Sequence, residues 1–191
     1  MFALSRLSQT VIGAVLVALL VITRGHHLPE IKHLLPSASW AVFFLAGIYL
    51  RPAWALAGLL GLAAFVDYAA ISRGGVSGFC VSPAYIALLP AYGLLWYAGR
   101  WYAGRHRFET ATLLPLALTV FFATAACELI TSGSFYLYSG YFTDSTLQEF
   151  AGRFIAYFPS SLRAMAFWIG TSALIHFVAV TRPLYGGTSR T

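Results

Sequence analysis

The sequence predicts an all-α, polytopic membrane protein with about six transmembrane helices. Of its 191 residues, 59% are hydrophobic and only 9% are charged, and the mean hydropathy is +0.75. A soluble domain does not need so much apolar surface, and long apolar runs recur from one end of the chain to the other. We therefore expect a single transmembrane domain over residues 1–191.

Short polar or proline-containing connections divide the apolar runs into spans, each of which needs about 20 residues to cross the bilayer. Arg51-Pro52 predicts a turn, and Ser82-Pro83 predicts another in which Ser82 is the N-cap. No small-residue cleavage site follows the first apolar run, so it is expected to be a span rather than a signal peptide. The predicted spans lie near residues 7–23, 35–50, 52–72, 83–101, 110–131 and 157–181.

Six spans place both termini on one side of the membrane, and the basic residues favour the cytoplasm as that side. With the N-terminus inside, seven arginines are cytoplasmic and five basic residues are outside. The compact cluster of Arg100, Arg105 and Arg107 then lies inside. The expected topology is N-in and C-in.

The connection over residues 132–156 is then an outer loop rich in aromatic residues, among them Tyr136 and Tyr138. The spacing of Thr146 and Glu149 predicts a capping box at the start of a short helix within it. A loop of this length and composition indicates either a lid over a pocket or an aromatic belt at the membrane interface.

Several functions are excluded by what the sequence lacks. The chain has a single lysine, Lys32, outside any glycine-rich phosphate loop, so we expect no direct nucleotide binding. The net charge of +6 sits in short connections, where it sets topology, so nucleic acid is not expected as a partner. Any energy for transport has to come from a partner or a gradient.

Cys80 is the principal candidate for chemistry. It lies in the glycine-rich segment 74–83, Gly-Gly-Val-Ser-Gly-Phe-Cys-Val-Ser-Pro, between two predicted spans. Arg73 and the start of the next helix favour the thiolate, which is a soft metal ligand. The alternatives are a small apolar filler and a disulfide with Cys127, the other cysteine of the chain.

Two further residues near the outer mouth are candidates. Asp67, in the outer part of the third span, can bind a polar ligand, orient Tyr85 or accept the thiol proton of Cys80, or it can make a structural hydrogen bond between helices. Tyr85 can pair with Asp67, bind a ligand or anchor the helix at the interface. Arg153 is expected to pair with Glu128 or to reach a ligand amide or phosphate.

The first span carries Ala14 and Ala18 one turn apart, which gives it a face of small residues. Such faces allow helices to approach closely. This face can meet another span of the chain or a separate membrane partner.

Taken together, these features resemble the substrate-binding S components of energy-coupling factor (ECF) transporters. Phe79-Cys80-Val81-Ser82-Pro83-Ala84-Tyr85, following Asp67, is similar to the BtuM branch, the cobalamin-specific S components of Gram-negative bacteria. The resemblance implies an ECF S-component-like bundle in the bacterial cytoplasmic (inner) membrane that binds cobalamin on its outer face and mediates its uptake. It also implies that an ECF energising module docks through Ala14 and Ala18.

The resemblance further implies a chemical role for Cys80 as the axial ligand of the corrin cobalt, in a base-off, cysteine-on complex. Electron donation from sulfur would labilise the opposite ligand and promote decyanation of cyanocobalamin. Asp67 and Tyr85 would support the Cys80 segment and bind corrin amides, and Arg153, Tyr136 and Tyr138 would contact the ligand from the outer loop.

A second function from a different class is consistent with the residues. A membrane thiol oxidoreductase would exchange electrons between Cys80, Cys127 and a quinone, although the closely spaced cysteine pair usual in such enzymes is absent. A purely structural subunit of a larger complex is a third possibility.

Overall fold

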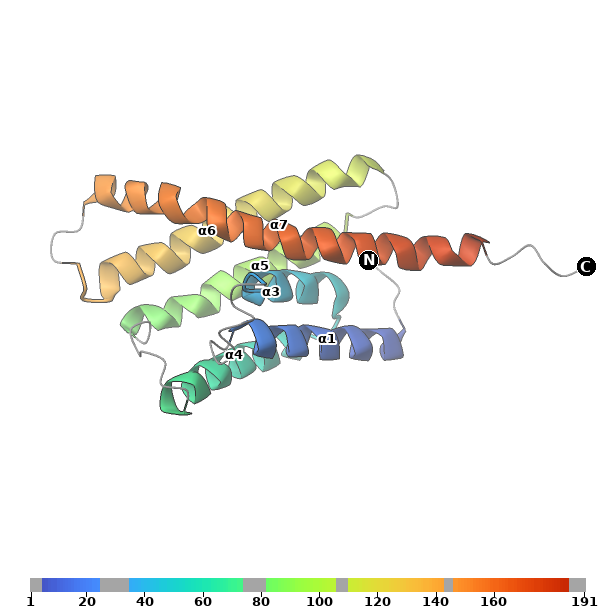
Figure 1. Ribbon diagram of the computed structural model, residues 1–191, viewed down its shortest axis with the longest axis horizontal. Helices are drawn as coiled ribbons and strands as arrows, with labels where there is room; N and C mark the ends of the chain where they lie inside the picture. The colour runs from blue at the N-terminus through green and yellow to red at the C-terminus, as the bar shows by residue number, and fades with distance from the viewer. Residues whose placement is uncertain (1–4, 25–34, 74–81, 106–109, 143–145, 186–191) are drawn as a thin grey trace, which may run out of the picture.

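The computed structural model describes residues 5–24, 35–73, 82–105, 110–142 and 146–185. These residues form a helical bundle in which no strand occurs (Figure 1). In chain order, the elements are α1 (Arg6–Arg24), α3 (Ser39–Tyr49), α4 (Trp54–Arg73), η2 (Pro83–Ala87), α5 (Leu88–Ala103), η3 (Thr110–Thr112), α6 (Leu113–Tyr138) and α7 (Leu147–Tyr185).

The predicted all-helical class is confirmed. Within the described residues, four helices are long and apolar enough to cross a membrane: α1, α4, α6 and α7. The predicted span over 35–50 is in fact a shorter helix. α3 has 11 residues, which corresponds to about 16 Å of helix, roughly half the thickness of the hydrocarbon core.

α3 is the centre of the bundle, which explains why its sequence is continuously apolar. It packs against α1, α4, α5 and α7, and Val42, Phe43, Phe44 and Ala46 have no exposed surface. A helix that is apolar on every side is either surrounded by protein or by lipid, and the sequence alone does not distinguish the two.

The crossing of α3 and α5 depends on two glycines, one on each helix, and each glycine faces the backbone of the opposite helix. A Cβ atom at Gly47 would lie 2.1 Å from the Trp96 carbonyl oxygen, and one at Gly99 would lie 2.0 Å from the Phe44 carbonyl oxygen. No larger residue fits at either position unless the helices separate. Small residues at such crossings bring helix backbones close together.

The predicted packing of the Ala14 and Ala18 face against another span is wrong. Both alanines are exposed on α1, and so are Val11 and Val15 beside them. The residues of α1 that the bundle buries are Leu16 and Leu20.

The predicted 25-residue outer loop over 132–156 is also wrong, because most of it is helix. α6 continues to Tyr138, and α7 begins at Leu147. Serine and threonine residues near the predicted end of the span donate their hydroxyls to carbonyl oxygens of the preceding turn, as Thr131 does to Cys127 (2.9 Å) and Ser134 to Ile130 (2.6 Å). Such bonds satisfy polar side chains inside a helix.

Half of the predicted capping box is confirmed, since the Glu149 N–H donates to Thr146 Oγ1 at 3.2 Å. The reciprocal bond is not formed, because the Thr146 N–H donates to the Tyr136 hydroxyl at 3.0 Å, and the helix that follows is not short but has 39 residues. The last residues of α1, α4 and α6 and the first residues of α3 and η2 all lie toward the end of the bundle that carries this cap (Figure 1). We call this the clasp end, after the side-chain network described next.

Candidate functional site

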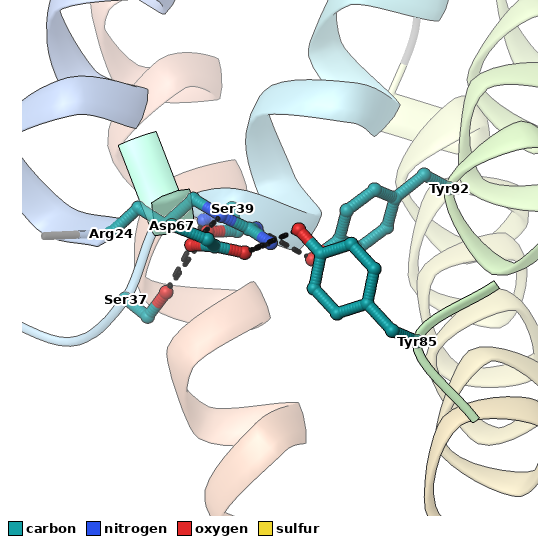
Figure 2. A network of polar contacts seen from close by, with 6 residues as sticks. All are labelled: Arg24, Ser37, Ser39, Asp67, Tyr85 and Tyr92. Atoms are coloured by element: carbon teal, nitrogen blue, oxygen red, sulfur yellow. Dashed lines mark hydrogen bonds and ion pairs between the residues drawn. The ribbon is translucent and has the colours of Figure 1, made fainter. Parts of the chain in front are cut away.

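Asp67, predicted from the sequence as a site residue, forms a two-pronged ion pair with Arg24 at the clasp end. The Arg24 Nε donates to Asp67 Oδ1 at 2.8 Å, and Nη2 donates to Oδ2 at 2.7 Å (Figure 2). The two side chains are only 10% and 24% exposed. Parallel N–H···O bonds of this kind fix the relative orientation of both groups, so the pair ties the end of α1 to α4.

Two tyrosines complete the network. Tyr85 in η2 donates its hydroxyl to Asp67 Oδ2 at 2.7 Å, and Arg24 Nη1 donates to the Tyr92 hydroxyl of α5 at 2.7 Å (Figure 2). The Tyr92 ring in turn stacks on Phe43 of α3, with ring centroids 4.3 Å apart. We call Arg24, Asp67, Tyr85 and Tyr92 the clasp, because they join four elements of the bundle.

The contacts of the clasp show which of its predicted hydrogen bonds Asp67 makes. Its two carboxylate oxygens accept three hydrogen bonds, two from Arg24 and one from Tyr85. Asp67 therefore orients Tyr85, as predicted, and also links helices.

Cys80 lies outside the described residues, but the two elements that flank its segment are described. α4 ends at Arg73, and η2 begins at Pro83. The bond from Tyr85 to Asp67 therefore joins the element before the segment to the element after it. The predicted side-chain cap by Ser82 is not formed; the Tyr85 N–H closes the first turn on the Ser82 carbonyl instead, at 2.8 Å.

The aromatic residues that were predicted to face a ligand lie at the α6–α7 hairpin. Tyr136 is buried, packs on Phe142 with ring centroids 4.8 Å apart, and donates its hydroxyl to Glu149 at 2.9 Å. Tyr138 is 64% exposed. Of the two, only Tyr138 has free ring surface to offer.

Arg153 is engaged by the same hairpin rather than by Glu128. It pairs with Glu149 at 2.9 Å, and its guanidinium lies 4.4 Å from the centroid of the Phe142 ring. The predicted ion pair between Arg153 and Glu128 is therefore wrong.

Glu128 is buried in α6 and is satisfied by serine hydroxyls. Ser132, one turn later, and Ser161 of α7, at 2.6 Å, both donate to its carboxylate. The bond from Ser161 links α6 to α7 inside the bundle. Glu128 is consequently a structural link between helices.

Cys127 is a free thiol with no exposed surface. A buried thiol in the bundle interior cannot meet a quinone, and this counts against the oxidoreductase interpretation. Burial also makes the Cys127 thiol unreactive toward oxidants, because reactive thiols are at least partly accessible to solvent.

Two parts of the clasp were not anticipated as site residues. In the sequence, Arg24 contributes only to the count of basic residues that sets topology, and nothing marks Tyr92 apart from the other residues of its span. Arg24 does carry a signal, because it ends the first predicted span and Asp67 lies in the outer part of the third, so the two opposite charges lie near the same side of the membrane. Charges at membrane depth are normally paired with each other.

Neither a scan of the chain against models of known protein families nor a search among curated proteins gives a match.

Proposed function

We propose that this protein binds cobalamin at the outer face of the bacterial cytoplasmic membrane and mediates its uptake, with the Cys80 thiolate as the axial cobalt ligand. The observation that carries the proposal is the hydrogen bond between Tyr85 and Asp67. It holds together the two elements between which the Cys80 segment runs.

A metal-binding thiol on a glycine-rich segment needs such a support. The glycines let the backbone approach a large macrocycle closely, but they also make the segment costly to order. A segment whose ends are fixed loses less entropy when it binds, because fewer conformations are open to it beforehand. The clasp thus supplies preorganisation to the segment that carries the sulfur.

The chemistry of cobalt fits a thiolate donor. Cobalt binding would hold the thiol deprotonated, and the sulfur would take the place of the nucleotide base of cobalamin. Electron donation from sulfur weakens the bond on the opposite face of the macrocycle. Cyanide then leaves as an anion with its electron pair, and water takes its position, without any change in the oxidation state of cobalt.

Transport requires a source of energy or a second conformation, and the exposed face of α1 is available for a partner. Ala14 and Ala18 are exposed there, so an energising module can reach them without any rearrangement of the bundle. This docking is part of the proposal.

The test is a titration of the purified protein with cyanocobalamin, followed by visible spectroscopy. Wild type is expected to give a spectrum characteristic of sulfur ligation and to release cyanide. Cys80→Ala should lose both, and Cys127→Ala, which removes the buried thiol, should retain both. Equal behaviour of the two variants would contradict the proposal.

A further inference from the structure

A groove of about 580 Å³ opens between the middle of α7 and the residues that precede α3. Functional ligand sites typically span about 300 to 1,000 Å³, so this volume suits a nucleotide-sized group better than a whole corrinoid. The groove is lined by Pro36, Ser37, Ser160, Ser161, Arg163, Ala164 and Phe167.

The walls of the groove are held in place by bonds on both sides. Trp168 donates its indole N–H to the Pro36 carbonyl at 3.0 Å, which joins α7 to the segment before α3. Behind the groove, the Ser161 hydroxyl donates to the buried Glu128. The lining is therefore built from elements that are already fixed to each other.

One face of α7 presents the groups that a ligand would meet. Ser160, Arg163 and Phe167 are spaced three and four residues apart, so they lie along one face of the helix, and all three are exposed. Arg163 donates its Nε to the Pro159 carbonyl at 3.3 Å, a bond that does not use its Nη groups.

The groove carries a positive charge for which the described residues supply no carboxylate. Within the described ranges, the ion pairs are those of Arg24 with Asp67 and of Arg153 with Glu149. Arg163 therefore has no carboxylate partner there. A guanidinium with hydroxyls beside it is a good donor set for phosphate oxygens, and Phe167 adds an apolar surface next to them.

The groove is also close to the clasp. The Ala38 N–H, one residue after Ser37, donates to Thr23 Oγ1 at 3.0 Å, and Thr23 immediately precedes Arg24. Figure 2 draws Ser37 together with the clasp residues, its hydroxyl bonded to Ser39 at 3.3 Å. A ligand held at the clasp end can thus extend into the groove.

We propose that this groove binds the phosphodiester of the nucleotide loop of cobalamin, with Arg163 and Ser160 as its donors. The inference rests on the proposed function, because a base-off complex releases the nucleotide base from cobalt and leaves the loop to be held elsewhere. The amide side chains of the corrin are neutral, and the phosphodiester of the loop is the anionic group that an arginine would select.

The test compares cobalamin with cobinamide, which lacks the nucleotide loop, on wild type and Arg163→Gln. We expect Arg163→Gln to weaken cobalamin binding about tenfold, as the loss of a charge-assisted hydrogen bond would do, and to leave cobinamide binding within about twofold. Ser160→Ala should shift the ratio of cobalamin to cobinamide affinity in the same direction by a smaller factor. Arg105→Gln, which removes an exposed guanidinium just after the end of α5, should leave this ratio unchanged.

The outcomes separate this inference from the proposed function. Suppose that both corrinoids give the sulfur-ligated spectrum, but Arg163→Gln changes the affinity for neither, or for both equally. The groove then does not bind the phosphodiester, and the inference fails while the proposed function stands. If neither corrinoid gives that spectrum with wild type, the proposed function fails and the inference falls with it.

A phospholipid headgroup carries the same phosphodiester chemistry, so the titrations are repeated in detergent with and without added phosphatidylglycerol. If the lipid abolishes the difference between wild type and Arg163→Gln for cobalamin by occupying the groove, a lipid source is favoured and the inference is overturned. If the difference persists, the corrinoid phosphodiester is the ligand.

Discussion

The ion pair between Arg24 and Asp67 is expected to be worth several kcal/mol, and Arg24→Met tests this. The methionine keeps most of the aliphatic stem but removes the three N–H groups that bond Asp67 and Tyr92. Asp67 then retains the Tyr85 hydroxyl as its donor. The substitution therefore strands a carboxylate in a largely buried position.

The magnitude follows from the burial of the pair. Removing one partner of a fully buried ion pair costs about 3 to 5 kcal/mol. Because the Asp67 side chain is 24% exposed, water can partly solvate the stranded charge, and we expect the lower end of that range, about 3 kcal/mol of unfolding free energy. Asp67→Asn should cost less, about 2 kcal/mol, because the amide can still accept from Tyr85.

The double variant Arg24→Met/Asp67→Asn measures the coupling energy between the two sites. It leaves no stranded charge, so its cost should be close to that of Asp67→Asn alone, which corresponds to a coupling energy of about 3 kcal/mol between the two sites. The free energies are measured by reversible unfolding in mixed micelles of dodecyl sulfate and a mild detergent, followed by tryptophan fluorescence.

A matched control is available in the exposed pair of Arg153 and Glu149, whose side chains are 40% and 44% exposed. Arg153→Met should cost much less unfolding free energy than Arg24→Met, because water screens an exposed ion pair. If Arg24→Met costs no more than this control, and the double variant is additive, the clasp is not a rigid link. The clasp would then not fix the two elements that flank the Cys80 segment.

Three further predictions follow from the same contacts. Tyr85→Phe, which removes only the hydroxyl that Asp67 accepts, should weaken cobalamin binding about tenfold while costing about 1 kcal/mol of stability; unchanged affinity in a titration would contradict the support role. Gly99→Ala places a Cβ atom 2.0 Å from the Phe44 carbonyl oxygen and should yield little folded protein in size-exclusion chromatography, whereas Gly93→Ala, with nothing within 4 Å of its Cβ, should be tolerated. Ala14→Phe should leave cobalamin binding intact and abolish capture of an energising module in a pull-down assay; retained capture would place the docking face elsewhere.

The sequence was most informative where a charge or a cap has a local consequence. Asp67 stands out in an apolar span because an acid at that depth needs a partner, and its pairing with Tyr85 is confirmed. The side-chain cap from Thr146 to the Glu149 N–H is confirmed as well, since it depends only on residues three apart. The identity of the ligand and the role of Cys80 stay predictions.

The sequence was least informative about where helices end and which helices contact each other. The fifth predicted span ends at residue 131, yet the Ser134 hydroxyl is satisfied by a backbone carbonyl one turn earlier, and α6 continues to Tyr138. Such a bond is available to serine and threonine in a helix as well as in a turn. Composition therefore could not place the end of the helix.

Arg24 shows the same limit for partners that are distant in sequence. An arginine at the end of a span satisfies the rule for topology whether or not it has a partner. Its bonds to Asp67 and Tyr92 join residues 43 and 68 positions apart, and only the packed bundle brings them together.

The stability of the clasp depends in the end on the core of the bundle. In a membrane, lipid is as apolar as leucine, so burial alone does not decide which helix faces meet, and close backbone packing does. Gly47 and Gly99 provide that packing and hold α5 against α3. Tyr92 of α5 stacks on Phe43 of α3 and accepts a hydrogen bond from Arg24. The position of the Arg24 guanidinium therefore depends on this crossing. A substitution at Gly99 that separates the two helices should therefore also loosen the bond between Asp67 and Tyr85, although neither residue touches the crossing.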